Sequence, residues 1–305
     1  MESLGHFHNL AADAQLRTSG TTLRDSCSKP RLIEMTETTT TTTTTETAAQ
    51  TSHSSAQVTT TTRKDNWWVE PALVFIGFTG FIIYATWRAF ENQFYEVGNY
   101  LSPFYSPKLI FSWWHFSPAL LILWVPAGFR ATCYYYRKAY YRAYFLDPPG
   151  CSVSHSGVLA RLLGVCGSKY FGETSFPFIF QNAHRYFFYL ATVVLAFLWY
   201  DAYKAFFDTS GNFSVTGLNL FMLLNVVLLS GYSSGCHACR HLVGGNLDCF
   251  SSCPSAKRRH GIWHFVTKLN EHHQLWAWMS LFSVGLTDLF VRQVSSGVFP
   301  DFKVF

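Results

Sequence analysis

Long apolar runs alternate with polar segments over most of the chain beyond its N-terminal tail. Five of these runs are long enough to cross roughly 30 Å of hydrocarbon, which takes about 20 helical residues. They cover residues 67–90, 110–135, 179–207, 214–234 and 274–294. Tryptophan, tyrosine and phenylalanine gather near their ends, where amphipathic rings favour the headgroup level of a bilayer. The pattern predicts an all-α, polytopic membrane protein built as a bundle of five transmembrane helices.

Composition agrees with a lipid environment. Hydrophobic residues make up 49% of the chain and charged residues 13%, about half the charged fraction that is usual in soluble proteins. Pro118 and Pro126 fall inside the second run, and a membrane helix tolerates them because neighbouring helices can bond the freed carbonyls. A large soluble helical domain is the alternative, and five well-spaced apolar runs argue against it.

The N-terminal segment has a different character. It contains an uninterrupted threonine run over residues 38–45 and few large apolar side chains, so it cannot bury enough surface to offset its chain entropy. We predict a disordered Ser/Thr-rich cytoplasmic tail over residues 1–66, a membrane domain over 67–296 and a short external C-terminal tail over 297–305. No apolar core with a small-residue cleavage site marks a signal peptide, and Met35 offers an alternative start.

Lysines and arginines give the bundle an orientation. Most of them fall in the tail and in the connections that share its side of the bundle, including the run Lys257, Arg258 and Arg259. The opposite side carries Arg88, Lys108, Lys204, Arg292 and Lys303. Because positive charge favours the cytoplasmic side, we expect a cytoplasmic N-terminus and an external C-terminus. The net charge of +5 then reflects topology, and no nucleic-acid partner is inferred from it.

This orientation brings thiols and imidazoles to the cytoplasmic ends of four predicted helices. Such groups lie at the end of the second run, at the start of the third, in the stretch GYSSGCHACRHLVGG after the fourth, and just before the fifth. They are Cys133, His184, Cys236, His237, Cys239, His241, His272 and His273. Polar groups inside a membrane bundle mark functional sites more often than those of soluble proteins do. A shared site at the cytoplasmic boundary is therefore expected.

The spacing within the fourth run limits how a metal could be bound. Cys236 and Cys239 are three apart, and His237 and His241 are four apart, so each pair would share one face of a continuous helix. The two faces differ by about one residue step, and all four side chains could not hold one tetrahedral ion. Some ligands should therefore come from neighbouring helices. The glycines at 244 and 245 should end the helix.

Several kinds of site remain open from these residues alone. Structural zinc could be held by Cys236 and Cys239 together with Cys249 and Cys253, although the gap between the two cysteine pairs is short. A Rieske-type 2Fe–2S cluster needs two thiolates and two imidazoles. Haem b could be ligated by His184 with His273 or His241. A di-iron desaturase is disfavoured because no H-x-x-H-H box occurs. The remaining alternative is that these are ordinary interfacial residues that bind no metal.

Several stretches together resemble a known family. They are YLSPFYSPKL at 100–109, CYYYRKAYYRAYF at 133–145, FQNAHRYFFYL at 180–190, GCHACRHLVGG at 235–245 and LTDLFV at 286–291. In these stretches the chain resembles the cytochrome b-like membrane-anchor subunit of an actinobacterial-type succinate dehydrogenase, a group with a membrane-embedded Rieske-type iron–sulfur cluster. The likeness covers residues 67–294, and the tail has no counterpart.

The resemblance implies a function for the membrane domain. A five-helix anchor would dock the flavoprotein and iron–sulfur subunits on its cytoplasmic face and pass electrons from them to membrane quinone. The implied localisation is the bacterial cytoplasmic membrane. The cluster ligands would be four of Cys133, His184, Cys236, His237, Cys239, His241 and His273. Candidate quinone contacts at the same level are Tyr134, Tyr136, Arg185, Tyr186 and Trp276, which could equally be interfacial anchors.

The chain itself shows no sign of dehydrogenase chemistry. It contains no dinucleotide fingerprint and no phosphate-binding loop, so flavin and succinate would belong to a partner. Two alternatives use the same residues differently: a b-haem anchor of the same complex, and a zinc-stapled membrane scaffold without redox function. An assembly factor or transporter is a third possibility. Metal content and the optical spectrum distinguish the first two from a 2Fe–2S protein.

Overall fold

The computed structural model describes residues 66–145, 178–245, 247, 249–251 and 254–302. The predicted disordered tail lies outside these residues except for Asn66. Cys253 and the last three positions of the C-terminal tail also lie outside them. The described part of the chain is mostly helical. The prediction of a helical membrane protein is therefore confirmed at this level.

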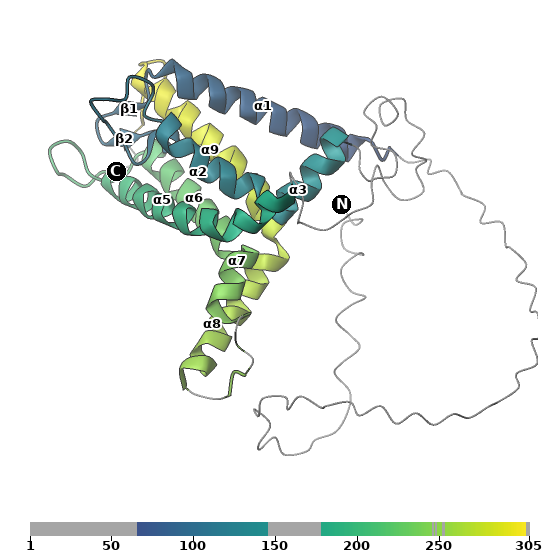
Figure 1. Cartoon of the computed structure of the whole chain (residues 1–305). Helices are drawn as coiled ribbons and strands as arrows, with labels where there is room; N and C mark the ends of the chain where they lie inside the picture. Colours follow the sequence, from purple (N-terminus) through teal and green to yellow (C-terminus); the bar gives the residue numbers. More distant parts are fainter. Residues whose placement is uncertain (1–65, 146–177, 246, 248, 252–253, 303–305) are drawn as a thin grey trace, which may run out of the picture. The chain divides into compact units, whose positions relative to one another are not determined.

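Five helices pack side by side in the described part of the chain (Figure 1). They are α1 (Val69–Glu91), α2 (Leu120–Ala131), α5 (His184–Lys204), α6 (Gly217–Ser234) and α9 (His273–Ser295). Helices α1, α5 and α6 are long and apolar enough to cross a membrane, and α2 is a shorter apolar helix. Large apolar side chains remain exposed on the outer faces, for example Ile76 at 66%. Such a surface suits lipid rather than water.

The second apolar run forms a shorter helix than the sequence predicts. Residues 110–119 are not helical, and α2 begins at Leu120 after Ser117 and Pro118. The residue before a proline avoids the α conformation, and the Ser117 hydroxyl instead accepts the backbone N–H of Ala119 at 3.3 Å. Pro126 lies inside α2 without ending it. After a break at Thr132 and Cys133, the chain continues as α3 (Tyr134–Tyr140) and a π turn, η2 (Tyr141–Phe145).

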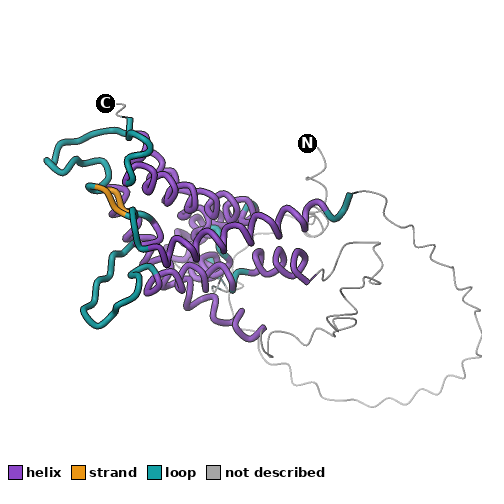
Figure 2. The backbone as a smooth tube through the Cα atoms, turned by 90° about the horizontal axis from the view of Figure 1, so that it is seen from above, coloured by secondary structure: helices purple, strands orange, loops and turns teal. Residues whose placement is uncertain are grey.

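One end of the bundle carries the two short antiparallel strands β1 (Glu96–Val97) and β2 (Tyr100–Leu101) and the 3-10 turn η1 (Pro103–Tyr105). Figure 2 shows the strands and several loops gathered there, and we call it the strand end. The C-terminal segment also folds back here, where Gly217 donates its backbone N–H to the carbonyl of Phe302 at 3.2 Å.

A buried ion pair fastens the strand end to α9. Arg292 donates from Nε to Asp288 at 2.9 Å and from a terminal nitrogen to Glu91 at 3.0 Å. Asp288 also accepts hydrogen bonds from Tyr84 at 2.7 Å and from Ser102. Asp288 is fully buried and Arg292 is 3% exposed. Since charges in such surroundings must be paired, the cluster ties α1, α9 and the loop before η1 together.

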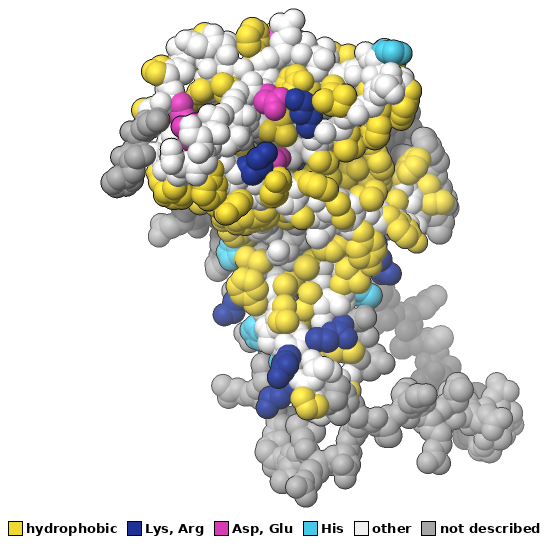
Figure 3. Space-filling view, turned by 90° about the vertical axis from the view of Figure 1, so that its left-hand side faces the viewer, with side chains coloured by type: hydrophobic (Ala, Val, Ile, Leu, Met, Phe, Trp, Pro, Cys, Tyr) yellow, Lys and Arg dark blue, Asp and Glu magenta, His cyan; other side chains and the backbone are white. Residues whose placement is uncertain are grey.

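The opposite end carries an arm that the sequence did not predict. It consists of α7 (His237–Arg240), the π turn η4 (His241–Gly245) and α8 (Pro254–Glu271), and it extends from the bundle (Figure 1). Arg240 donates to the Thr267 hydroxyl at 3.1 Å and so links α7 to α8. Lysine and arginine side chains mark this protruding part in Figure 3, while apolar side chains cover the bundle. We call this the arm end.

Candidate metal centre

Two thiols and two imidazoles from four separate elements meet at the arm end. Cys133 lies between α2 and α3, His184 begins α5, Cys236 lies between α6 and α7, and His273 begins α9. His184 Nε2 is 2.9 Å from Cys236 Sγ, and His273 Nε2 is 3.6 Å from Cys133 Sγ. Both cysteines and His273 are buried, and all four side chains line one cavity of about 790 Å³. The predicted gathering of donors from several helix ends is therefore observed.

A break in the chain sets the position of Cys236. Helix α6 ends at Ser234, Gly235 follows it, and Cys236 has an extended backbone with φ −68° and ψ 145°. Its sulfur then accepts the backbone N–H of Ala238 at 3.4 Å and caps α7. The expectation that Cys236 and Cys239 share one helical face is wrong, because the helix does not continue across Gly235. The thiol is turned toward the other three donors instead.

Neighbouring residues orient the two histidines. The Thr132 hydroxyl lies 2.8 Å from His184 Nδ1, which leaves Nε2 facing Cys236. The Phe129 ring stacks on His184 with centroids 4.9 Å apart, and the Tyr232 ring stacks on His273 at 4.9 Å. A partner on the second ring nitrogen fixes which nitrogen can bind a metal. His184 is thus oriented by both a hydrogen bond and a stacked ring.

Two imidazole nitrogens that line this cavity, Nδ1 of His241 and Nδ1 of His273, are buried and have no hydrogen-bond partner among the described residues. Nearly all buried polar groups in folded proteins are satisfied by protein, water or an ion. Unpaired imidazole nitrogens beside the four donors fit a site built around an additional group.

Two thiols and two imidazoles are the donor types of a Rieske-type 2Fe–2S site. Among the described residues, no three His, Cys, Asp or Glu side chains are arranged to hold one metal ion. A Rieske-type cluster needs only two protein ligands on each iron, two thiolates on one and two imidazoles on the other. Haem would use the imidazoles and leave both thiols without a role. The set of Cys133, Cys236, His184 and His273 has the required composition.

Burial also affects the acidity of the thiol. Removal from water raises the pKa of Cys236 to about 12, against a smaller opposing effect of the Ala238 backbone N–H. The free thiol is therefore protonated at neutral pH. Because a metal ligand must be the thiolate, binding of iron would release this proton.

The other predicted ligands lie in less suitable positions. His237 is exposed and His241 is half-buried, and both line the same cavity as the donors. Cys239 is a half-buried free thiol that does not line the cavity, and burial raises its pKa. Cys249 is in a disulfide, so it offers no free thiolate to zinc. Cys253 lies outside the described residues.

The predicted quinone contacts do not form one group. Tyr134, Arg185 and Tyr186 line the 790 Å³ cavity from its exposed side, and Trp276 packs against Gly231 instead. Tyr136 is buried and donates its hydroxyl to the carbonyl of Ala277 at 2.6 Å.

Arg130 was not singled out in the sequence analysis. It donates to the Tyr136 hydroxyl at 2.6 Å and to Ser280 Oγ at 3.0 Å, and its guanidinium lies over the Tyr232 ring, 4.7 Å from the centroid. An arginine within an apolar run is a signal of function in a membrane protein. That signal could have found it.

Comparison with known proteins agrees with this architecture. A family model described as actinobacterial succinate dehydrogenase subunit SdhC matches residues 69–297. A chain of the Mycobacterium smegmatis Sdh1 complex in the apo form is similar in structure, with a TM-score of 0.68 and 40% sequence identity. The match covers 81% of this chain and 94% of that one. Comparison with curated protein sequences gives no match. The resemblance found in the sequence is confirmed, and the chain belongs to the family of actinobacterial SdhC subunits, the membrane anchors of succinate dehydrogenase.

Proposed function

We propose that this membrane anchor passes electrons from the soluble subunits of succinate dehydrogenase to quinone in the membrane. The electrons would pass through a Rieske-type 2Fe–2S cluster held by Cys133, His184, Cys236 and His273. The observation that supports this most strongly is that two thiols and two imidazoles from four elements line one cavity, with each imidazole beside a thiol at 2.9 and 3.6 Å.

The proposal includes a topology with five membrane crossings. Helices α1, α5, α6 and α9 would each cross the bilayer of a bacterial cytoplasmic membrane, and the shorter α2 would cross together with α3, with the arm end and the N-terminus in the cytoplasm. The basic residues of α8, among them Lys257, Arg258 and Lys268, support this orientation because cytoplasmic segments favour positive charge.

The soluble partners would dock at the arm end. The similar chain of 40% identity belongs to a complex called Sdh1, and by analogy the partners here would be a flavoprotein and an iron–sulfur subunit. The donor set lies at this same end, next to α7. Electrons from a docked iron–sulfur subunit would therefore enter close to the four donors.

Each residue around the donor set would have a distinct task. Cys133 and Cys236 would supply thiolates, and His184 and His273 would supply neutral imidazoles. A cluster bound there would accept and release one electron at a time. Thr132 holds the His184 ring in the orientation that presents Nε2. The buried aromatic residues beside the donors exclude water, which keeps the local dielectric low.

Replacement of single cysteines tests the proposal. In the purified complex, Cys133→Ser and Cys236→Ser should each remove acid-labile sulfide and a low-average-g resonance at this site, and should abolish quinone reduction. Reduction of an artificial dye by the soluble subunits should persist. Cys239→Ser is the matched control, because this thiol does not line the cavity, and it should retain the signal.

Three results would contradict the proposal. Retention of the resonance in both Cys133→Ser and Cys236→Ser would exclude these ligands. A Soret band without labile sulfide would indicate haem b instead. Zinc without iron would indicate a scaffold with no redox function.

A further inference from the structure

Tyr232 carries a buried hydroxyl that the fold leaves unused. The residue lies on α6, two positions before the helix ends at Ser234, and its side chain is 1% exposed. The hydroxyl has no hydrogen-bond partner among the described residues. A buried hydroxyl without a partner destabilises a folded protein, and such groups often have a functional reason.

The ring of Tyr232 is held against the proposed histidine ligands. It stacks on the His273 ring with centroids 4.9 Å apart and planes inclined by 20°. It also meets the Phe129 ring edge-on at 5.3 Å, and Phe129 in turn stacks on His184. Because these rings pack against both imidazoles, the tyrosine has little freedom to turn away from the donor set.

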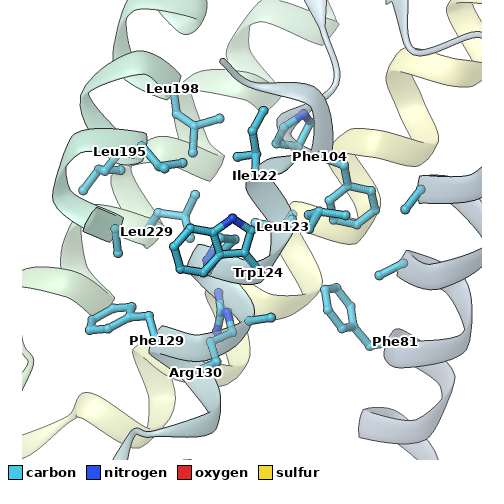
Figure 4. Close-up of a pocket in the computed structure, with 18 of the residues that line it drawn as sticks. Phe81, Phe104, Ile122, Leu123, Trp124, Phe129, Arg130, Leu195, Leu198 and Leu229 are labelled. Carbon is cyan, nitrogen blue, oxygen red and sulfur yellow. The ribbon is translucent and has the colours of Figure 1, made fainter. Parts of the chain in front are cut away.

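Arg130 places a positive charge over the Tyr232 ring. Phe129, Arg130 and Tyr232 line one apolar cavity, and Figure 4 shows Phe129 and Arg130 at one end of it. The guanidinium carbon of Arg130 lies 4.7 Å from the Tyr232 centroid. A cation over an aromatic face attracts the electrons of the ring, which makes the phenol O–H a stronger donor. The guanidinium N–H groups donate to Tyr136 and Ser280 instead of to the Tyr232 hydroxyl.

A second buried tyrosine beside Tyr232 has its hydroxyl fully engaged. The Tyr136 ring lies 6.1 Å from the Tyr232 ring, and the Tyr136 side chain is 2% exposed. The Tyr136 hydroxyl accepts from Arg130 at 2.6 Å and donates to the carbonyl of Ala277 at 2.6 Å. Of these two tyrosines, Tyr232 alone retains an O–H that is available to another acceptor.

The acceptor within reach of this hydroxyl is the sulfur of Cys133. The Cys133 thiol lies beside the Tyr232 hydroxyl but outside hydrogen-bond geometry, and Nε2 of His273 is 3.6 Å from the same sulfur. A neutral thiol is a weak acceptor, whereas a charged acceptor forms a shorter and stronger hydrogen bond. Because a metal ligand must be the thiolate, binding of iron would make Cys133 the partner that the hydroxyl lacks.

We propose that Tyr232 donates a hydrogen bond to the Cys133 thiolate and thereby raises the reduction potential of the iron–sulfur site. The inference rests on the proposed function. Reduction adds one electron, supplied by the partner iron–sulfur subunit, and leaves the site more negative; the tyrosine keeps its proton. A hydrogen bond to a sulfur ligand stabilises the more negative state. The site then accepts electrons from the partner more readily.

Tyr232→Phe tests the inference, because it keeps the stacked ring and removes only the hydroxyl. In purified complex depleted of quinone, a redox titration followed by the low-average-g resonance should show a one-electron reduction constant about tenfold lower. This corresponds to a reduction potential about 59 mV lower. Iron and acid-labile sulfide should stay at their wild-type levels.

Tyr136→Phe is the matched control, because it removes a neighbouring buried hydroxyl that is already bonded to Arg130 and Ala277. It should shift the reduction potential by less than half as much. An unchanged potential in Tyr232→Phe, or equal shifts in the two variants, would overturn the inference.

Replacement of Tyr232 by 3-fluorotyrosine tests the direction of the effect. The fluorinated phenol is a stronger O–H donor of nearly the same size, so at slightly acidic pH it should raise the reduction potential above that of wild type. A lower potential would show that packing, rather than the hydrogen bond, controls it. A wild-type complex without labile sulfide and the resonance would refute the proposed function and this inference together. A normal wild-type signal whose potential responds to neither replacement would overturn this inference alone.

Discussion

Removal of Arg292 should strongly destabilise the protein. Its side chain is 4% exposed, and the carboxylate of Asp288 has no exposed surface. Arg292→Leu would delete two hydrogen bonds from Nε to that carboxylate, at 2.9 and 3.1 Å, and would leave only Tyr84 and Ser102 as its donors among the described residues. Loss of one partner from a buried ion pair costs about 3–5 kcal/mol. Loss of the contact with Glu91 adds little to this destabilisation, because Glu91 is 23% exposed and still forms its ion pair with Arg88 at 2.6 Å.

The measurement is SDS-induced unfolding of the purified complex in mixed micelles, compared with the double variant Asp288→Leu/Arg292→Leu. The double variant removes both charges, so it should recover most of the loss suffered by Arg292→Leu alone. A double-mutant cycle then isolates the coupling between the two residues. An unfolding free energy of Arg292→Leu within about 1 kcal/mol of wild type would refute the reasoning. A loss in the double variant equal to the sum of the two single losses would refute it as well.

Two further predictions concern close packing and ligand orientation. A Cβ atom at Gly231 would lie 2.6 Å from the Trp276 ring, so Gly231→Ala should lower the unfolding free energy by about 1–3 kcal/mol. Gly80→Ala, where nothing lies within 4 Å, should be neutral or slightly stabilising in the same SDS titration. Thr132→Val removes the hydrogen bond to His184; iron should bind about tenfold more weakly, as measured by chelator competition, and undiminished affinity would contradict the orienting role.

Patterns along the chain predicted those features that depend on local sequence. Apolar runs predicted the positions of α1, α5, α6 and α9 to within a few residues. The alternating direction of successive runs predicted that the thiols and imidazoles lie at one end of the bundle. The structure brings Cys133, His184, Cys236 and His273 together there. The late start of α2 was not expected, because hydropathy does not record the backbone restriction that Pro118 imposes on Ser117.

Features that depend on distant partners were missed. Arg130 contacts Ser280, which is 150 positions away, and Tyr84 contacts Asp288, which is 204 positions away. A single sequence shows a polar residue within an apolar run, but it does not show its partner. The sequence left seven candidate ligands open for a similar reason, because it does not show the break at Gly235 that gives Cys236 an extended backbone. At this break Gly235 packs closely against α8, where the carbonyl of Leu269 is 3.1 Å from a Cβ built at the glycine.

The break between α6 and α7 has a mechanical consequence. Cys133 and His184 lie in the bundle, after α2 and at the start of α5, whereas Cys236 and His273 lie at the two junctions between the bundle and the arm, before α7 and after α8. Asn270 on α8 donates a side-chain N–H to the carbonyl of Gly235 at 2.7 Å, one residue before Cys236, so the two junctions contact each other. A tilt of the arm would therefore move Cys236 and His273 relative to Cys133 and His184. A subunit bound against α8 would restrict that tilt, which would couple assembly of the complex to the geometry of the site.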